Sequence, residues 1–228
     1  GVERDDTEAI RWFRLAADQG DADAQFNLGM AYAYGDAGVE RDEAEAARWY
    51  RKAADQGHAF AQFNLGSSYR RGEGVERDYA EAARWWRLAA DQGHAEAQLN
   101  LGAMYENGRG VEQDDTEAVR WYRKAADQGH AGAQYDLGVM YATGRGVEQD
   151  DAEAVRWYQL AADQGDADAE DALEELGVPL DEPSADTEPD VQEMSESELI
   201  AAAEQGLASA QNRLGAMYAD ADGVERDD

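Results

Sequence analysis

Two rows of arginines recur through the chain at an interval of about 36 residues, and their side chains could bind carboxylates. The first row directly precedes a tryptophan, and its members are Arg11, Arg48, Arg84, Arg120 and Arg156. The second row lies three positions later, with Gln159 in its fifth place, and its members are Arg14, Arg51, Arg87 and Arg123. Guanidinium groups form forked hydrogen bonds with planar anions. These rows could therefore bind an acidic peptide or an anionic glycan.

The alternative for the arginines is pairing within the chain. A glutamate stands three residues before each member of the first row, and these glutamates are Glu8, Glu45, Glu81, Glu117 and Glu153. On a helix, residues three apart are neighbours on the surface, so opposite charges at this spacing attract. Both readings remain open from the sequence.

The histidines have one position in common, directly after the repeated phrase Ala-Ala-Asp-Gln-Gly. They are His58, His94 and His130, and Asp21 and Asp166 take the same place in other copies. Side chains one repeat apart would be separated by roughly 10 Å, the spacing of packed helices, which is too wide for one metal ion. We expect a polar residue that begins a helix and no metal site.

An aromatic pair follows each arginine of the first row. The pairs are Trp12-Phe13, Trp49-Tyr50, Trp85-Trp86, Trp121-Tyr122 and Trp157-Tyr158. Adjacent residues on a helix point about 100° apart, so we expect at most one of each pair to point fully into the core. The other would flank a groove or the next unit, where an aromatic stripe could stack on a peptide or a sugar.

Acidic loops are the remaining candidate for chemistry. Glu112–Asp115 and Glu148–Asp151 carry oxygen ligands suitable for Ca²⁺, but they lack the alternating pattern of a dedicated calcium loop. Acidic residues in front of a helix also favour its N-terminal dipole. The sequence contains no recognisable catalytic triad, phosphate-binding loop or zinc-protease motif. We therefore expect no catalytic residues and no cofactor, and an enzyme with a groove site is the weakest alternative.

The elements that position these residues are repeated units. The phrase Ala-Ala-Asp-Gln-Gly ends at Gly20, Gly57, Gly93, Gly129 and Gly165, and each copy is preceded by Gly-Val-Glu. A period of this length predicts a solenoid of stacked units. In residues 74–110, two stretches of apolar residues at helical spacing are separated by Gly93 and closed by a glycine-rich loop. Each unit is thus predicted to be helix, turn, helix and loop.

The pattern resembles the Sel1-like repeat family, which is related to tetratricopeptide repeats. The matching sequence motif begins with Gly-Val-Glu, continues through Trp-Tyr, Ala-Ala-Asp-Gln-Gly and Ala-Gln, and ends with Leu-Gly-x-x-Tyr. It is nearly complete in residues 38–146. The resemblance implies an all-α fold, an α/α superhelical solenoid of helix-turn-helix repeats. It also implies a role in protein–protein interaction, with the Trp-bearing helix lining the concave face.

Departures from the pattern suggest three parts. Residues 1–177 hold five Sel1-like repeats, and residues 178–194 hold proline and many acids, which predicts a linker. Residues 195–228 read as a sixth, degenerate repeat, either a cap or the start of a further array. The chain closes with Gly-Val-Glu-Arg-Asp-Asp, the six residues with which it opens. We expect either a fragment of a longer array or ends that meet.

Composition narrows the partners. The chain has 228 residues, with 51 acidic and 20 basic side chains and a formal charge of −31. The negative electrostatic field of such a chain argues against nucleic acids and anionic membranes as partners. There are no cysteines, which excludes disulfides and thiolate sites, and no run of about 18 apolar residues that would span a membrane. For a bacterial protein, the sequence leaves three locations open: secreted, in the cell envelope or in the cytoplasm.

These observations favour a non-enzymatic scaffold that binds a protein or peptide partner through the two arginine rows. The alternative is a structural subunit of a head-to-tail homopolymer or extracellular fibre. Repeated units with matching ends motivate it, because a head-to-tail contact that does not close produces a filament.

Overall fold

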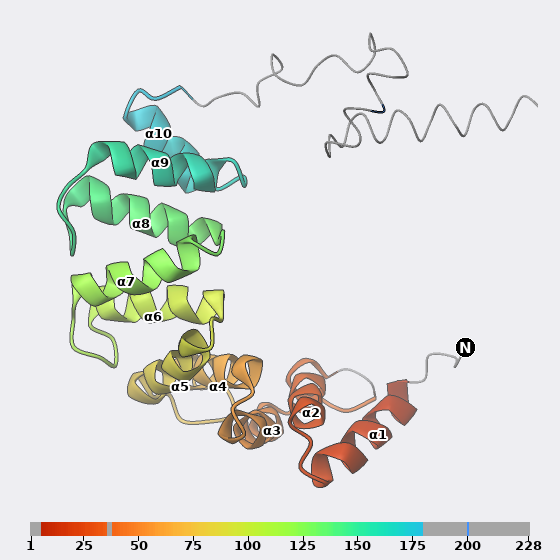
Figure 1. Ribbon diagram of the computed structural model, residues 1–228. Coiled ribbons are helices and arrows are strands. Elements are labelled where there is room, and N and C mark those ends of the chain that lie inside the picture. The colour runs from red at the N-terminus through yellow and green to blue at the C-terminus, as the bar shows by residue number, and fades with distance from the viewer. Residues whose placement is uncertain (1–5, 36–37, 180–199, 201–228) are drawn as a thin grey trace, which may run out of the picture. The chain divides into compact units, whose positions relative to one another are not determined.

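The computed structural model describes residues 6–35, 38–179 and Ile200, with the backbone alone at Asp6 and Thr7 (Figure 1). Over these residues the chain is all-α, with ten α-helices and no strand. The helices are α1 (Asp6–Asp18), α2 (Ala22–Tyr34), α3 (Glu43–Asp55), α4 (Ala59–Arg71), α5 (Tyr79–Asp91), α6 (Ala95–Asn107), α7 (Asp115–Ala126), α8 (Ala131–Thr143), α9 (Asp151–Ala162) and α10 (Ala167–Glu175). The prediction of ten helices in five pairs is confirmed.

The chain divides into two units, residues 1–179 and 180–228. Nearly all of the second unit lies outside the described residues. The expected sixth repeat at residues 195–228 lies there, apart from Ile200, and so does the expected linker, apart from Val178 and Pro179. Both stay predictions, and the description below concerns the first unit.

Recurrent aspartates and glycines set the helix boundaries. Asp78 precedes α5, and its carboxylate accepts hydrogen bonds from the backbone N–H groups of Ala80 and Glu81 at 2.8 and 3.1 Å. Such a cap satisfies donors that a helix start would leave unpaired. At the other end, Gly72 follows α4 with φ of 74°, a left-handed conformation that glycine adopts without steric cost. A left-handed glycine ends α2, α4, α6 and α8 in this way.

Consecutive helices pack against each other, and the contact is most extensive between an even helix and the odd helix that follows. A glycine in the even helix permits this close approach. A Cβ atom on Gly102 would lie 2.7 Å from the ring of Tyr122 on α7. Gly102 therefore lies where α6 and α7 touch.

The aromatic pairs correct one expectation, because both members are buried in α3, α5, α7 and α9. The two rings enter successive cores: Trp85 belongs to the cluster around Leu65, whereas Trp86 packs with Leu101. An odd helix lies between two even helices, so side chains 100° apart can both be covered. The aromatics of these helices are core residues, whereas Trp12 on α1 is exposed.

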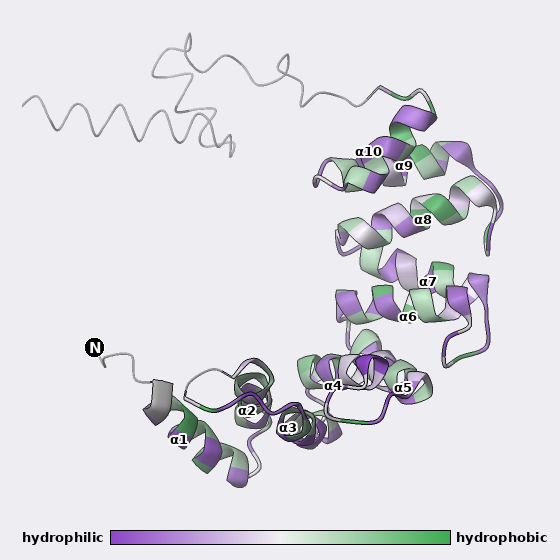
Figure 2. Ribbon diagram, turned by 180° about the vertical axis from the view of Figure 1, so that it is seen from behind, coloured by the Kyte–Doolittle hydropathy of each residue, from purple (hydrophilic) through white to green (hydrophobic). Residues whose placement is uncertain are grey.

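Each helix buries only part of its surface. Figure 2 shows hydrophobic and hydrophilic residues sharing the same helices, as expected of helices with one packed face and one solvated face. The arginine rows lie on the odd helices, and the exposed or buried position of each guanidinium decides what it can do.

Candidate functional site

Every arginine of the first row pairs with the glutamate three residues earlier on its own helix. The nitrogen–oxygen distances are 2.8 Å for Arg11–Glu8 and Arg48–Glu45, 3.0 Å for Arg84–Glu81 and 3.2 Å for Arg156–Glu153, and Arg120 pairs with Glu117 in the same way. These arginine side chains stay between 51% and 70% exposed. The internal pairing considered from the sequence is present, and the guanidiniums remain accessible to solvent.

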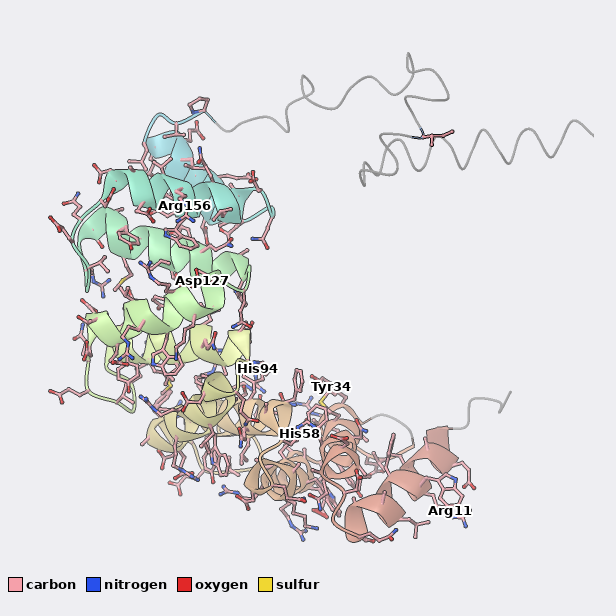
Figure 3. The ribbon with its side chains drawn as sticks, viewed as in Figure 1. Arg11, Tyr34, His58, His94, Asp127 and Arg156 are labelled. Atoms are coloured by element: carbon pink, nitrogen blue, oxygen red, sulfur yellow. The ribbon has the colours of Figure 1, made fainter. Side chains whose placement is uncertain are left out.

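Three arginines of the first row, Arg11, Arg84 and Arg156, also lie over the adjacent tryptophan. The Arg84 guanidinium carbon is 4.2 Å from the Trp85 ring centroid, within the range of a cation–π contact. Glu81 accepts a hydrogen bond from Trp85 Nε1 at 3.0 Å, so one carboxylate joins the arginine and the indole. Arg156 and Trp157 repeat this arrangement with Glu153, and the Arg11 guanidinium carbon lies 5.3 Å from the Trp12 ring centroid. Figure 3 labels Arg11 on α1 and Arg156 on α9. Arg11, Arg84 and Arg156 therefore have a defined orientation at the surface.

Trp121 departs from that arrangement. Its Nε1 is the one buried side-chain polar atom without a hydrogen-bond partner among the residues that the structure describes. Glu117 binds Arg120 instead, whereas Glu81 and Glu153 bind both groups in their helices. A small rotation of Glu117 would supply the missing acceptor.

The second row links each odd helix to the next even helix. Arg14 donates to the hydroxyl of Tyr32 at 2.5 Å. Arg51 and Arg123 donate to Tyr69 and Tyr141 in the same way. Arg87 differs, because its guanidinium carbon lies 5.4 Å from the ring centroid of Tyr105. Each tyrosine stands 18 residues after its arginine.

The arginine and the tyrosine disappear from the series together. Gln159 replaces the fifth arginine, and position 177, where the tyrosine would stand, is glycine. The second row also reaches the following repeat, since the guanidinium carbon of Arg51 is 5.2 Å from the Trp85 ring centroid. The second row thus joins helices within the chain, and partner binding by this row stays a prediction.

The histidines begin the even helices, as expected. The imidazoles of His58, His94 and His130 accept a hydrogen bond from the backbone N–H three residues later, as Asp21 and Asp166 do. The His94 ring stacks on Phe63 at 4.6 Å between centroids. Burial lowers the pKa of His94, because a charged imidazole loses solvation there.

Sequence reasoning missed a ladder of buried glutamines. In each rung, a glutamine on an even helix donates Nε2 to a backbone oxygen eight residues earlier. Its Oε1 accepts, at 2.7 Å, from a glutamine that stands one or two residues after the end of the following odd helix. The rungs are Gln25–Gln56, Gln62–Gln92, Gln98–Gln128 and Gln134–Gln164. The sequence did carry a sign of this ladder, because the two glutamines of each rung recur at the same two repeat positions. Their partnership across 30 or 31 residues appears only when the helices stack.

The acidic loops act as helix caps. Asp114 and Asp150 accept hydrogen bonds from the backbone N–H groups of Glu117 and Glu153 at the starts of α7 and α9. Over the described ranges, no three metal-ligating side chains gather into a group that could hold an ion. None of the helices described there is long and apolar enough to cross a bilayer.

Comparison with known proteins identifies the repeat. The Sel1 repeat family model matches residues 1–21, 22–58, 59–94, 95–130, 131–166 and 208–228. The chain belongs to the Sel1-repeat family. Four of these matches begin at the first residue of an even helix, so the family's unit joins an even helix to the next odd one, which is the pair that packs most extensively. The unit predicted from the sequence begins half a repeat earlier, at Gly-Val-Glu, and so pairs an odd helix with the even helix that follows it.

Solved structures agree with this assignment. A protective antigen of uropathogenic Escherichia coli with an SLR fold superposes with a TM-score of 0.75 and 38% identity, covering 95% of this chain and 45% of the antigen. A Sel1 repeat protein from Oxalobacter formigenes gives a TM-score of 0.70 and 37% identity, covering 83% and 75% of the two chains. The chain thus spans less than half of the antigen's length. No curated protein matched the sequence. Sel1-repeat proteins generally mediate protein–protein interactions.

Proposed function

We propose that this Sel1-repeat chain is a non-enzymatic scaffold that binds an acidic protein or peptide through its arginines, with the first row as the primary contact. The observation that carries the proposal is the exposure of that row in every odd helix. One cation per repeat lets an extended partner make the same contact several times. In a chain with a formal charge of −31, these regularly spaced cations are a distinct recognition feature.

The glutamates that pair with the first row do not prevent binding. Exposed ion pairs at this helical spacing contribute only about 0.2–0.5 kcal/mol each. A partner carboxylate can replace Glu81 on Arg84 at a small cost, and the Trp85 ring would still hold the guanidinium in place. The second row would contribute from beside the tyrosines, with less freedom to change partner.

A double charge reversal tests this proposal. Arg84→Glu with Arg120→Glu places carboxylates in two adjacent central repeats, and we expect loss of partners captured by affinity from the source organism and identified by mass spectrometry. The matched control is Arg77→Glu with Arg109→Glu, which makes the same charge change at two exposed loop arginines. Retained capture by the first variant, with both proteins folded by circular dichroism, would refute a role for this row.

A second candidate is head-to-tail self-association, and the exposure of one tryptophan favours it. Trp12 on α1 is 59% exposed, whereas Trp85 at the same repeat position is 3% exposed because α4 covers it. An even helix from another copy would cover Trp12 in the same way. Multi-angle light scattering across a concentration series tests this, with Trp12→Arg as the variant that should abolish any growth in mass. A constant monomer mass for the unmodified chain would exclude this alternative.

A further inference from the structure

One interhelix space occurs in three consecutive repeats, and its contents differ. It lies between the C-terminal end of one even helix, the start of the next odd helix and the following even helix. We name each space by its two even helices. The α2/α4 slot is an open pocket of about 390 Å³ whose lining includes Arg41, Tyr50, Asn64, Ser68 and Arg71. The corresponding α4/α6 slot is smaller, at about 170 Å³.

The α6/α8 slot shows what this space can bind, because the chain fills it with its own carboxylate. The hydroxyl of Tyr122 donates to Glu106 Oε2 at 2.6 Å. Arg145 Nη1 donates to the other oxygen of Glu106 at 2.8 Å, and its Nη2 donates to Asp115 at 3.1 Å. A tyrosine hydroxyl and a guanidinium therefore hold a carboxylate from two sides.

The α2/α4 slot lacks that internal carboxylate. Ala33 stands at the repeat position of Glu106, and Ser68 stands where α6 and α8 carry Met104 and Met140. Both replacements shorten a side chain, which accounts for the open volume. Tyr50, at the position of Tyr122, remains in place because its ring packs on Gly29. The slot keeps its tyrosine donor and has no carboxylate at the Glu106 position, while Glu73 stands at the repeat position of Arg145.

Two donors in the α2/α4 slot share a weak acceptor, the sulfur of Met30, and the Asn64 side chain also lies within hydrogen-bonding reach of the Tyr50 hydroxyl. Tyr50 is 4% exposed, and its hydroxyl donates to Met30 Sδ at 3.3 Å. The side-chain amide of Asn64 donates to the same sulfur, also at 3.3 Å. A thioether is a weak acceptor, so an anionic oxygen would improve both hydrogen bonds. Burial raises the pKa of Tyr50 well above its usual range, so the hydroxyl keeps its proton at neutral pH.

Two cations stand at the rim of the pocket. Arg71 pairs with Glu73 at 2.6 Å and Arg41 with Glu43 at 2.5 Å, and the four side chains are between 37% and 63% exposed. Ion pairs with this exposure are weak and exchange partners readily. Position 64 matters as well, because α8 carries Asp136 where α4 carries the neutral Asn64. An amide at this place donates to an incoming anion, whereas an aspartate would repel it.

We propose that the α2/α4 slot binds a glutamate side chain of a partner peptide, to which Tyr50 donates as Tyr122 donates to Glu106 in the α6/α8 slot. Tyr50 and Asn64 donate to one carboxylate oxygen, and Arg71 exchanges Glu73 for the other. This inference rests on the proposed function, since it assigns a specificity pocket to a protein-binding scaffold. It uses residues outside both arginine rows, so the two can be tested apart.

The test is a titration with short peptides followed by nuclear magnetic resonance on the ¹⁵N-labelled full chain. The probes are Ac-Ala-Glu-Ala-NH₂, Ac-Ala-Gln-Ala-NH₂ and free glutarate. We expect the Glu peptide to shift the side-chain amide signal of Asn64 and to bind at least about tenfold more tightly than the Gln peptide, because only a carboxylate makes charge-assisted hydrogen bonds. Equal affinity for the Gln peptide would overturn the proposal. Equal affinity for glutarate would overturn its assignment to a peptide.

Variants decide where the peptide binds. Ser68→Met fills the slot with the residue that α6 and α8 already carry, so it should fold and lose the Glu-peptide shift. Tyr50→Phe removes only the hydroxyl and should weaken binding about tenfold. Tyr158→Phe is the matched control at the same repeat position, and it should bind as the unmodified chain does. Unchanged binding by the folded Ser68→Met protein would refute the site.

The same peptide assay separates the slot proposal from the proposed role of the arginine rows. Arg84→Glu with Arg120→Glu should bind the Glu peptide normally, because neither residue lines the slot. Loss of partner capture with intact peptide binding would support both proposals, and peptide binding that fails with this variant alone would contradict the slot assignment.

Discussion

Asp136 on α8 is held in a state that destabilises the fold at neutral pH. Its pKa is raised from 3.8 to about 7, mainly by burial and also by the nearby carboxylates of Glu106 and Asp166, while His130 acts in the opposite direction. The adjacent Tyr122 hydroxyl donates to Glu106 and leaves Asp136 without that donor. The corresponding residues of α4 and α6 are Asn64 and Asn100. We predict that Asp136→Asn stabilises the protein.

The sign and size follow from the two pKa values. Between the unfolded value of 3.8 and the folded value of about 7, the folded chain binds more protons than the unfolded chain. Stability at this site therefore falls as pH rises through that window and is constant above it. Each unit corresponds to about 1.4 kcal/mol, so the penalty approaches about 4 kcal/mol at pH 8 and is about 1.5 kcal/mol at pH 5. Asp136→Asn should remove most of it.

Urea unfolding followed by circular dichroism at pH 5 and pH 8 measures this difference. The stabilisation by Asp136→Asn should be larger at pH 8 by about 2–3 kcal/mol. Asp171→Asn, on the exposed surface of α10, is the control for removal of a carboxylate without burial. A gain of the same size at both pH values, or a loss at pH 8, would refute the reasoning.

Two further substitutions test the packing. Gly102→Leu should destabilise the protein by about 1–3 kcal/mol, because even a Cβ atom there lies 2.7 Å from the Tyr122 ring; an unchanged melting temperature would contradict the close approach. Gln98→Leu should cost about 1–3 kcal/mol in urea unfolding, since the backbone oxygen of Ala90 and the amide of Gln128 both lose a buried partner. The control Glu96→Gln, at an exposed position of α6, should stay within about 0.5 kcal/mol.

Most of the helices could be predicted from the sequence, because the residues that begin and end each helix act on their immediate neighbours in the chain. Asp78 caps the residues directly after it, and Gly72 ends the helix directly before it, so their spacing predicts the helices. The pairing of Arg84 with Glu81 was also local and was anticipated as one of two readings. Contacts across a repeat were not anticipated, because they depend on how the helices stack.

The α2/α4 slot was beyond sequence reasoning for a related reason. A cavity is a difference between the volume that the helices enclose and the volume that side chains fill. Ser68 and Ala33 are unremarkable residues on a helix until their larger counterparts, Met104 and Glu106, are seen in the neighbouring repeats. The burial of both Trp85 and Trp86 was likewise mispredicted, because one helix serves two cores.

The glutamine ladder contributes to how strongly the unfolding of one repeat is coupled to the unfolding of the next. Each rung couples adjacent repeats, and in a linear array such nearest-neighbour terms set how many units unfold together. At the end of the ladder, α10 carries Glu170 where α8 carries Gln134, and the arginine–tyrosine link is missing at the same junction. Among the ten described helices, the α9–α10 junction therefore has the weakest nearest-neighbour coupling. Opening fluctuations should begin there and pass inward with decreasing frequency, which gives the repeats a graded rather than a uniform protection against hydrogen exchange.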